Sequence, residues 1–113
     1  MTTHQIVLIP GDGIGPEVAA ATTQVLHAAK APLKWVEHQA GVAALETLGE
    51  VLPEKTLDAV REHGLALKGP CTTPVGMGFT SVNVQLRKRL DLYAAVRPIR
   101  NLPGVETRYQ DVD

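Results

Sequence analysis

Apolar runs alternate with segments of helical spacing along the first part of the chain. Residues 5–9 (QIVLI) are apolar apart from one glutamine and end at Pro10 and Gly11, which is typical of a strand buried on both faces. A glycine-rich turn follows, and Pro16 can open a helix because its missing N–H costs nothing at the first position. The next segment predicts a helix, since apolar residues recur there at helical spacing, namely Val18, Ala21, Val25, Leu26 and Ala29.

The same alternation continues toward residue 96. Residues 33–39 predict a second strand in which Trp35 is half buried, and residues 41–48 predict a short helix or turn. A clearer helix begins at Pro53, and Gly64 suits its C-terminal cap. The remaining predicted elements are a third strand, a helix and a fourth strand, at residues 65–67, 82–91 and 93–96.

Strand–helix alternation predicts an α/β fold with a largely parallel open sheet and flanking helices. A chain of 113 residues is one domain's worth at most. Residues 100–113 have weak patterning and end without a closing element, and an open sheet would be left with a bare edge. We therefore interpret residues 1–113 as an amino-terminal fragment of a larger fold.

Composition and charge exclude several classes of partner. The formal net charge of −1 and the aromatic share of 4% give no support for nucleic-acid binding or for attraction to an anionic membrane.

A lone cysteine, Cys71, rules out an intrachain disulfide and a zinc site made of cysteines. The sequence shows no signal peptide and no membrane-spanning run, so we expect a cytoplasmic protein. The histidines lack metal-ligand spacing; they are His4, His27, His38 and His63.

The helix at residues 82–91 carries the candidate chemistry. Asn83 and Arg87 are four residues apart and share a face, and Ser81 is placed to cap the helix. Arg97 stands at the C-terminal end of the predicted fourth strand, where ligands of open α/β sheets bind. Because a guanidinium binds a carboxylate through a planar fork, the four residues predict a site for a small, multiply charged anion. The alternative is an ordinary solvated basic helix face.

Two further motifs have a structural and a functional interpretation. The glycines of residues 11–15 suggest the dinucleotide-binding motif G-x-G-x-x-G, but its third glycine would fall at position 16, which is proline. Glu37 is only a weak candidate for the acidic residue that ends the second strand in that motif. This favours a tight turn whose glycines take positive φ. In the loop after residue 68, Thr72 and Thr73 either satisfy backbone groups or contact a ligand, and Cys71 is interpreted as packing rather than as a nucleophile.

Three motifs resemble the β-decarboxylating dehydrogenases, a family that includes isocitrate, 3-isopropylmalate, homoisocitrate and tartrate dehydrogenases. IPGDGIGPEV resembles the family's opening turn, LKGPCTTPVG its central loop and LRKRLDLYAAVRP its arginine segment. The similarity runs from about Ile6 to the end of the chain. It implies that the chain is an incomplete portion of the isocitrate/isopropylmalate dehydrogenase fold.

The resemblance also implies roles for individual residues. Ser81 and Asn83 match a serine and an asparagine that bond a carboxylate of isocitrate, where isopropylmalate enzymes carry apolar side chains. Arg87 and Arg97 then clamp substrate carboxylates, and Thr72 lies where a family threonine meets the nicotinamide end of the cofactor. The sequence of this segment, GFTSVNVQLRKRLDLYAAVRP, resembles the bacterial and mitochondrial NAD-type isocitrate dehydrogenases more than other members of the family. Ala95 and Met77 depart from the family pattern, which has asparagine and glycine there.

What the family places beyond this length is equally informative. Its catalytic tyrosine and lysine, its metal-binding aspartates and most of its adenosine site lie there, so the resemblance implies no catalytic and no metal residue in this chain. The resemblance implies NAD and Mg²⁺ or Mn²⁺ as cofactors, with the metal ligands outside the chain. The expected partners are a tricarboxylate substrate and, when full length, further copies in a homo-oligomer.

Alternative functions remain open at this stage. The substrate could instead be 3-isopropylmalate or homoisocitrate. A protein of another class, a non-catalytic regulatory subunit, could keep the arginines as an allosteric site for citrate or isocitrate. An inactive truncated relic is the third alternative. Within the enzyme interpretation, the isolated fragment is predicted to be inactive.

Overall fold

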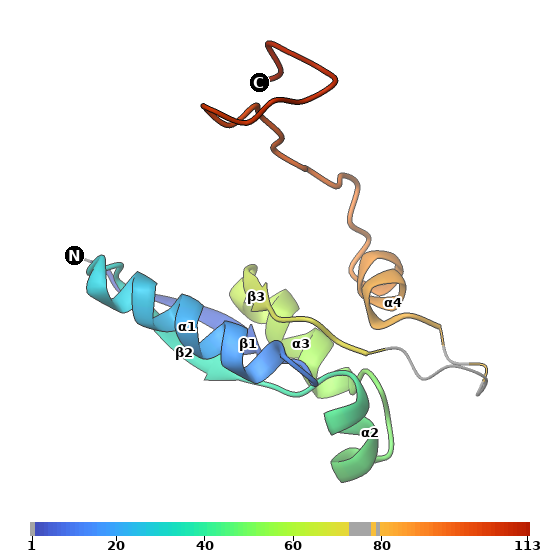
Figure 1. Cartoon of the computed structure of the whole chain (residues 1–113). Helices are drawn as coiled ribbons and strands as arrows, with labels where there is room; N and C mark the ends of the chain where they lie inside the picture. The colour runs from blue at the N-terminus through green and yellow to red at the C-terminus, as the bar shows by residue number, and fades with distance from the viewer. Residues whose placement is uncertain (1, 73–77, 79) are drawn as a thin grey trace.

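The computed structural model describes residues 2–72, 78 and 80–113 (Figure 1). Thr73 and Met77, which the sequence analysis singled out, lie outside the described residues. The elements follow one another as β1 (His4–Ile9), α1 (Gly15–Ala28), β2 (Leu33–Glu37), α2 (Val42–Leu48), α3 (Glu54–His63), β3 (Ala66–Lys68) and α4 (Val82–Arg89).

The described strands form one three-stranded sheet in the order β2-β1-β3. Both pairings are parallel, with His4 opposite Leu33 and Val7 opposite Ala66. The first strand is therefore central, which explains why residues 5–9 are nearly continuously apolar. The predicted α/β class with a largely parallel open sheet is confirmed.

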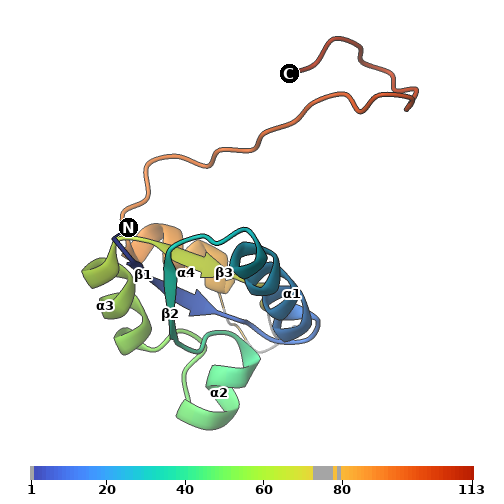
Figure 2. The same ribbon diagram turned by 90° about the vertical axis from the view of Figure 1, so that its left-hand side faces the viewer.

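Helices cover both faces of this sheet. Figure 2 shows α1 and α3 on opposite sides of β1. Val7 and Ile9 point toward α3 and α4 and belong to the main core, while Leu8, between them, lines a cavity together with Ala19 of α1. The buried residues of the main core are Val7, Ile9, Ala40, Val51, Leu52, Leu57, Ala59 and Val82.

Local signals at the ends of α3 behave as the sequence predicts. Pro53 occupies the N-cap position, and Gly64 ends the helix in the left-handed conformation with φ of 70°. Inside the helix, Leu57 is fully buried, and so is Thr56. The Thr56 hydroxyl donates to the Gln39 carbonyl at 2.9 Å, so this buried polar group is satisfied.

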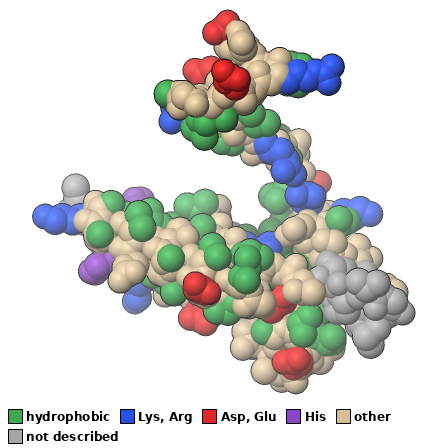
Figure 3. All heavy atoms as spheres, viewed as in Figure 1, with side chains coloured by type: hydrophobic (Ala, Val, Ile, Leu, Met, Phe, Trp, Pro, Cys, Tyr) green, Lys and Arg blue, Asp and Glu red, His purple; other side chains and the backbone are tan. Residues whose placement is uncertain are grey.

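The buried side of α1 differs from the predicted apolar stripe. Gly15 and Ala19 are the buried residues of this helix, whereas Val18 is 44% exposed and Val25 is 67% exposed. Apolar side chains therefore remain on the surface around α1, as the space-filling view shows (Figure 3). A glycine is needed where this helix begins, because a Cβ at Gly15 would lie 2.3 Å from the Pro10 carbonyl oxygen and 2.8 Å from the Pro70 carbonyl oxygen.

The predicted fourth strand is wrong. Residues 93–96 have no strand structure, and the segment after α4 leads away from the sheet in both ribbon views (Figures 1 and 2). Tyr93 is fully exposed and Val96 is 88% exposed. An apolar run becomes a strand only when a neighbouring strand supplies hydrogen-bond partners, and none of the described strands lies beside this run.

Candidate functional site

Ser81 stands at the N-cap of α4, as predicted, but it does not cap the helix with its side chain. Its backbone is extended, with φ of −47° and ψ of 133°, and no hydrogen bond joins its hydroxyl to the first turn. The Ser81 carbonyl accepts from the Gln85 N–H at 3.0 Å and so begins the helix. The predicted capping bond is therefore wrong, and the half-buried hydroxyl is not committed to α4.

The two faces of α4 are clearly divided. Val82 is 3% exposed and belongs to the main core, and Leu86 and Leu90 pack against that core from partly buried positions. Asn83 and Arg87 are exposed. The apolar face thus attaches the helix to the sheet and leaves the candidate amide and guanidinium in solvent.

The basic residues at the end of α4 do different things. Arg89 bonds the Glu54 carboxylate and donates to the Leu52 carbonyl at 3.4 Å. Arg61 of α3 donates to Glu54 at 2.9 Å and to the Arg89 carbonyl at 3.1 Å, at the last residue of α4. These contacts fasten α4 to α3. Among the described residues, Arg87 forms no ion pair of this kind.

Arg97 lies on the segment after α4 rather than at a strand end. This segment is exposed from Asp91 to Arg100. Within the described part of the chain, no hydrogen bond or ion pair joins the Arg97 side chain to Arg87, Ser81 or Asn83. Ser81 at the N-cap and Asn83 and Arg87 on α4 are therefore held together by one helix, whereas Arg97 belongs to the exposed segment that follows it.

The loops at the carboxyl ends of the strands pack directly on one another. Gly69 donates its N–H to the Ile9 carbonyl at 2.8 Å, and Asp12 donates its N–H to the Pro70 carbonyl at 3.0 Å. Gly11 has φ of 79°, and a Cβ added to it would lie 1.9 Å from the Pro70 oxygen. Gly13 also has positive φ, at 59°. The glycines therefore serve a tight turn against a second loop, as the sequence predicts.

Asp12 is the residue that the sequence analysis missed. Its Oδ1 accepts from the Thr72 N–H at 2.6 Å, and its Oδ2 accepts from the Val42 N–H at 2.7 Å. Partial burial acts to raise the pKa of Asp12, but the hydrogen bonds from Thr72 and Val42 and the charge of Lys68 outweigh it, so the pKa is lowered. The only sequence signal is a carboxylate between two turn glycines.

Thr72 and Cys71 lie in the loop that Asp12 holds. The Thr72 side chain is exposed, while the Cys71 thiol is half buried and lies 3.6 Å from the Lys68 Nζ. Burial raises the pKa of Cys71, and the nearby Lys68 charge only partly offsets this effect. A thiol that stays protonated agrees with a packing role.

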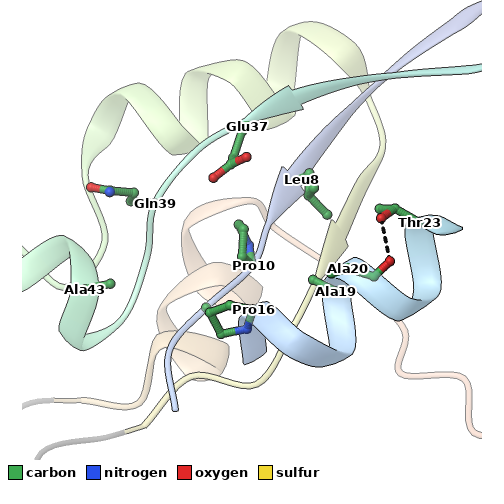
Figure 4. Close-up of a pocket in the computed structure, with 10 residues that line it drawn as sticks. Leu8, Pro10, Pro16, Ala19, Ala20, Thr23, Glu37, Gln39 and Ala43 are labelled. Atoms are coloured by element: carbon green, nitrogen blue, oxygen red, sulfur yellow. Dashed lines mark hydrogen bonds between the residues drawn. The ribbon is translucent and has the colours of Figure 1, made fainter. Parts of the chain in front are cut away.

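A cavity of about 480 Å³ lies between α1 and the end of β2 (Figure 4). Its polar lining residues include Glu37, the last residue of β2, and Gln39, which follows the strand. Thr23 on α1 also lines it, and the Thr23 hydroxyl donates to the Ala20 carbonyl at 2.9 Å. The cavity is lined by Gly11 and Glu37 but not by the residues predicted to bind the substrate or the cofactor, which are Ser81, Asn83, Arg87, Arg97 and Thr72. The cavity is therefore separate from the candidate anion site.

Two other features are absent from the residues that the structure describes. No group of three or more histidine, cysteine, aspartate or glutamate side chains there could hold a metal ion. No helix in the same part of the chain has the length and apolar character that crossing a bilayer requires.

Comparison with known proteins identifies the family. Residues 5–112 match the family described as isocitrate/isopropylmalate dehydrogenase. The chain is 46% identical over 106 residues to the chloroplastic 3-isopropylmalate dehydrogenase of Solanum tuberosum, covering 94% of this chain and 30% of that protein. It is 47% identical over 106 residues to the mitochondrial isocitrate dehydrogenase [NAD] catalytic subunit 5 of Arabidopsis thaliana, covering 94% and 28%. Other relatives are named as NADP enzymes.

A solved structure agrees with this comparison. The isocitrate dehydrogenase from Methylococcus capsulatus superimposes with a TM-score of 0.88 at 48% identity, covering 96% of this chain and 32% of that one. The chain thus spans about a third or less of the length of the relatives it matches. The fold, the motifs and these comparisons together show that the chain belongs to the isocitrate/isopropylmalate dehydrogenase family and corresponds to the amino-terminal portion of that family's fold.

Proposed function

We propose that this chain is the amino-terminal part of an NAD-dependent isocitrate dehydrogenase. Such an enzyme oxidises and decarboxylates isocitrate to 2-oxoglutarate while NAD⁺ is reduced. In the proposal this chain supplies substrate-binding residues, and the catalytic residues belong to the rest of the protein. The observation that carries the proposal is the exposed polar face of α4, which presents Asn83 and Arg87 on a helix that its opposite face attaches to the core.

Arg87 and Arg97 bind carboxylates of the substrate in this proposal. Each guanidinium offers paired N–H groups that match the two oxygens of one carboxylate. Their contribution is positioning and charge neutralisation rather than proton transfer. Because Arg87 forms no ion pair with the described residues, its charge is available for a ligand.

Ser81 and Asn83 choose between substrates in this proposal. A hydroxyl and an amide can both donate hydrogen bonds to the carboxylate that isocitrate carries, and an isopropyl group would leave these donors unpaired. The Ser81 hydroxyl, which makes no capping bond to α4, is free of the competing role that the sequence suggested. This pair favours isocitrate over 3-isopropylmalate.

The proposal assigns the cofactor a contact in this chain but assigns the metal ion none. Thr72 contacts the nicotinamide end of NAD in the proposal, and its exposed side chain agrees with such a contact. The described residues contain no cluster that fits Mg²⁺ or Mn²⁺, so the proposal assigns no metal ligand and no metal-dependent step to them. The full-length protein is proposed to be a cytoplasmic homo-oligomer.

A binding experiment on the 113-residue chain tests the substrate assignment. Isocitrate and 3-isopropylmalate are titrated while the Asn83 side-chain amide and the Arg87 Nε–H are followed by NMR. We expect isocitrate to bind about tenfold more tightly, since one hydrogen bond to a charged group has about this effect. Asn83→Leu should remove the preference, and the control Lys88→Gln should not. Equal binding of both acids by the unaltered chain would contradict the assignment to isocitrate.

An activity measurement tests the division of labour. The chain alone should produce no NADH from isocitrate and NAD⁺ with Mg²⁺ present. Clear isocitrate-dependent turnover by the chain would show that it contains catalytic residues, against the proposal.

A further inference from the structure

One carboxylate joins three loops at the carboxyl edge of the sheet. Asp12 belongs to the turn after β1, and it bonds the N–H of Val42, at the start of α2, and the N–H of Thr72, in the loop after β3. The two partners are 30 and 60 residues away in the sequence.

The surroundings of Asp12 are shaped to hold this arrangement. A Cβ at Gly41 would lie 2.2 Å from the Asp12 Oδ2, so the carboxylate fits only because residue 41 lacks a side chain. The Asp12 N–H also bonds the Pro70 carbonyl, which sits against Gly11. The backbone and the side chain of Asp12 thus both hold the loop that leads to Thr72.

We propose that Asp12 is a positioning residue for the cofactor, because its carboxylate fixes the backbone at Thr72 and thereby sets where the Thr72 side chain meets the nicotinamide end. This inference rests on the proposed function. Asp12 itself touches neither cofactor nor substrate in the proposal. It acts through the Thr72 N–H, at 2.6 Å. The Asn83 and Arg87 side chains lie on α4, outside these contacts, so isocitrate binding should not depend on Asp12.

The discriminating variant is Asp12→Asn, with Asp111→Asn as the matched control. An asparagine keeps the shape of the side chain, but its NH₂ group cannot accept the second N–H, so one of the two bonds is lost. Asp111 is exposed and lies outside the sheet and helices, and its substitution makes the same change in charge. NMR measures the exchange rates of the Val42 and Thr72 amides, and then the responses to NAD⁺ at Thr72 and to isocitrate at Arg87.

We expect Asp12→Asn to speed exchange of at least one of the two amides and to weaken the NAD⁺ response about tenfold, while the isocitrate response is unchanged. Asp111→Asn should change none of these. A NAD⁺ response as strong as in the unaltered chain, despite faster exchange, would overturn the proposal and leave Asp12 a merely structural residue.

A variant of Thr72 separates the position of its backbone from the contact that its side chain makes. Thr72→Ala keeps the N–H bond to Asp12, so its amide should exchange slowly while the NAD⁺ response is lost. If Asp12→Asn does not fold, Asp12→Glu, which keeps the charge on a longer side chain, is measured against the same criteria. A chain in which NAD⁺ shifts no resonance but isocitrate shifts Arg87 would overturn this inference alone. Loss of both responses in the unaltered chain would overturn the proposed function as well.

Discussion

Residues 4–90 and residues 92–113 both carry apolar side chains, but only the first region buries them. Val7 and Leu57 are 0% exposed, whereas Ile99 is 69% exposed and Tyr109 is 68% exposed. The first region supplies a central strand with a neighbour on each side and helices on each face. The second region has no such neighbour among the described residues. Apolar composition therefore produces structure only where a second surface is available to cover it.

The largest difference between the regions should come from truncating a core side chain. Leu57→Ala removes a fully buried side chain and should lower the free energy of unfolding by about 2–5 kcal/mol. Ile99→Ala, in the exposed segment, should change it by less than about 0.5 kcal/mol. Urea unfolding followed by circular dichroism measures both. Similar losses for the two variants would show that residues 92–113 are packed in solution.

A glycine in each region provides a matched test of backbone contact. Gly11 and Gly104 both have φ of 79°, but only a Cβ at Gly11 would meet another chain segment, the Pro70 carbonyl at 1.9 Å. Both alanine variants incur the cost of positive φ, and Gly11→Ala should lose a further ~1–3 kcal/mol through overpacking. The difference between the free energies of unfolding of the two variants measures the contact between residue 11 and the Pro70 carbonyl. Equal losses would mean that the loop at Pro70 does not lie against Gly11.

The weakest expected effect concerns the boundary between the regions. Glu54→Gln removes the acidic partner of Arg61 and Arg89, which fasten α4 to α3. Because all these side chains are exposed, the loss of stability should be small. It should disappear in 1 M NaCl, where the Debye screening length is about 3 Å. Glu106→Gln, in the exposed segment, is the control. A large loss that persists in high salt would mean that the contact is not chiefly electrostatic.

Local signals predicted much of the first region. The apolar run of β1, the cap at Gly64 and the apolar face of α4 each depend on a few neighbouring residues, and all three are present in the structure. The predicted fourth strand failed because strand formation depends on a pairing partner that the run itself does not encode.

Tertiary contacts decided what the local pattern could not. The burial of Gly15 and Ala19 instead of the apolar stripe of α1 depends on contacts with other segments, since a Cβ at Gly15 would lie 2.3 Å from the Pro10 carbonyl oxygen. The role of Asp12 depends on residues 30 and 60 positions away. The grouping of Ser81, Asn83 and Arg87 was predictable because Ser81 is the N-cap residue of the helix that carries the other two. Their joint action with Arg97 stays a prediction.

The strand order β2-β1-β3 has a consequence for how the chain acquires its structure on the ribosome. The earliest strand to be synthesised is the one that both others need, since Val7 pairs with Ala66 and His4 with Leu33. Its residues can pair with β2 first, but one edge of the strand stays without its neighbour until Ala66–Lys68 have left the exit tunnel. During that interval the nascent chain exposes a ready template for intermolecular strand pairing, so this stretch is where we would look first for chaperone contacts or for the onset of aggregation.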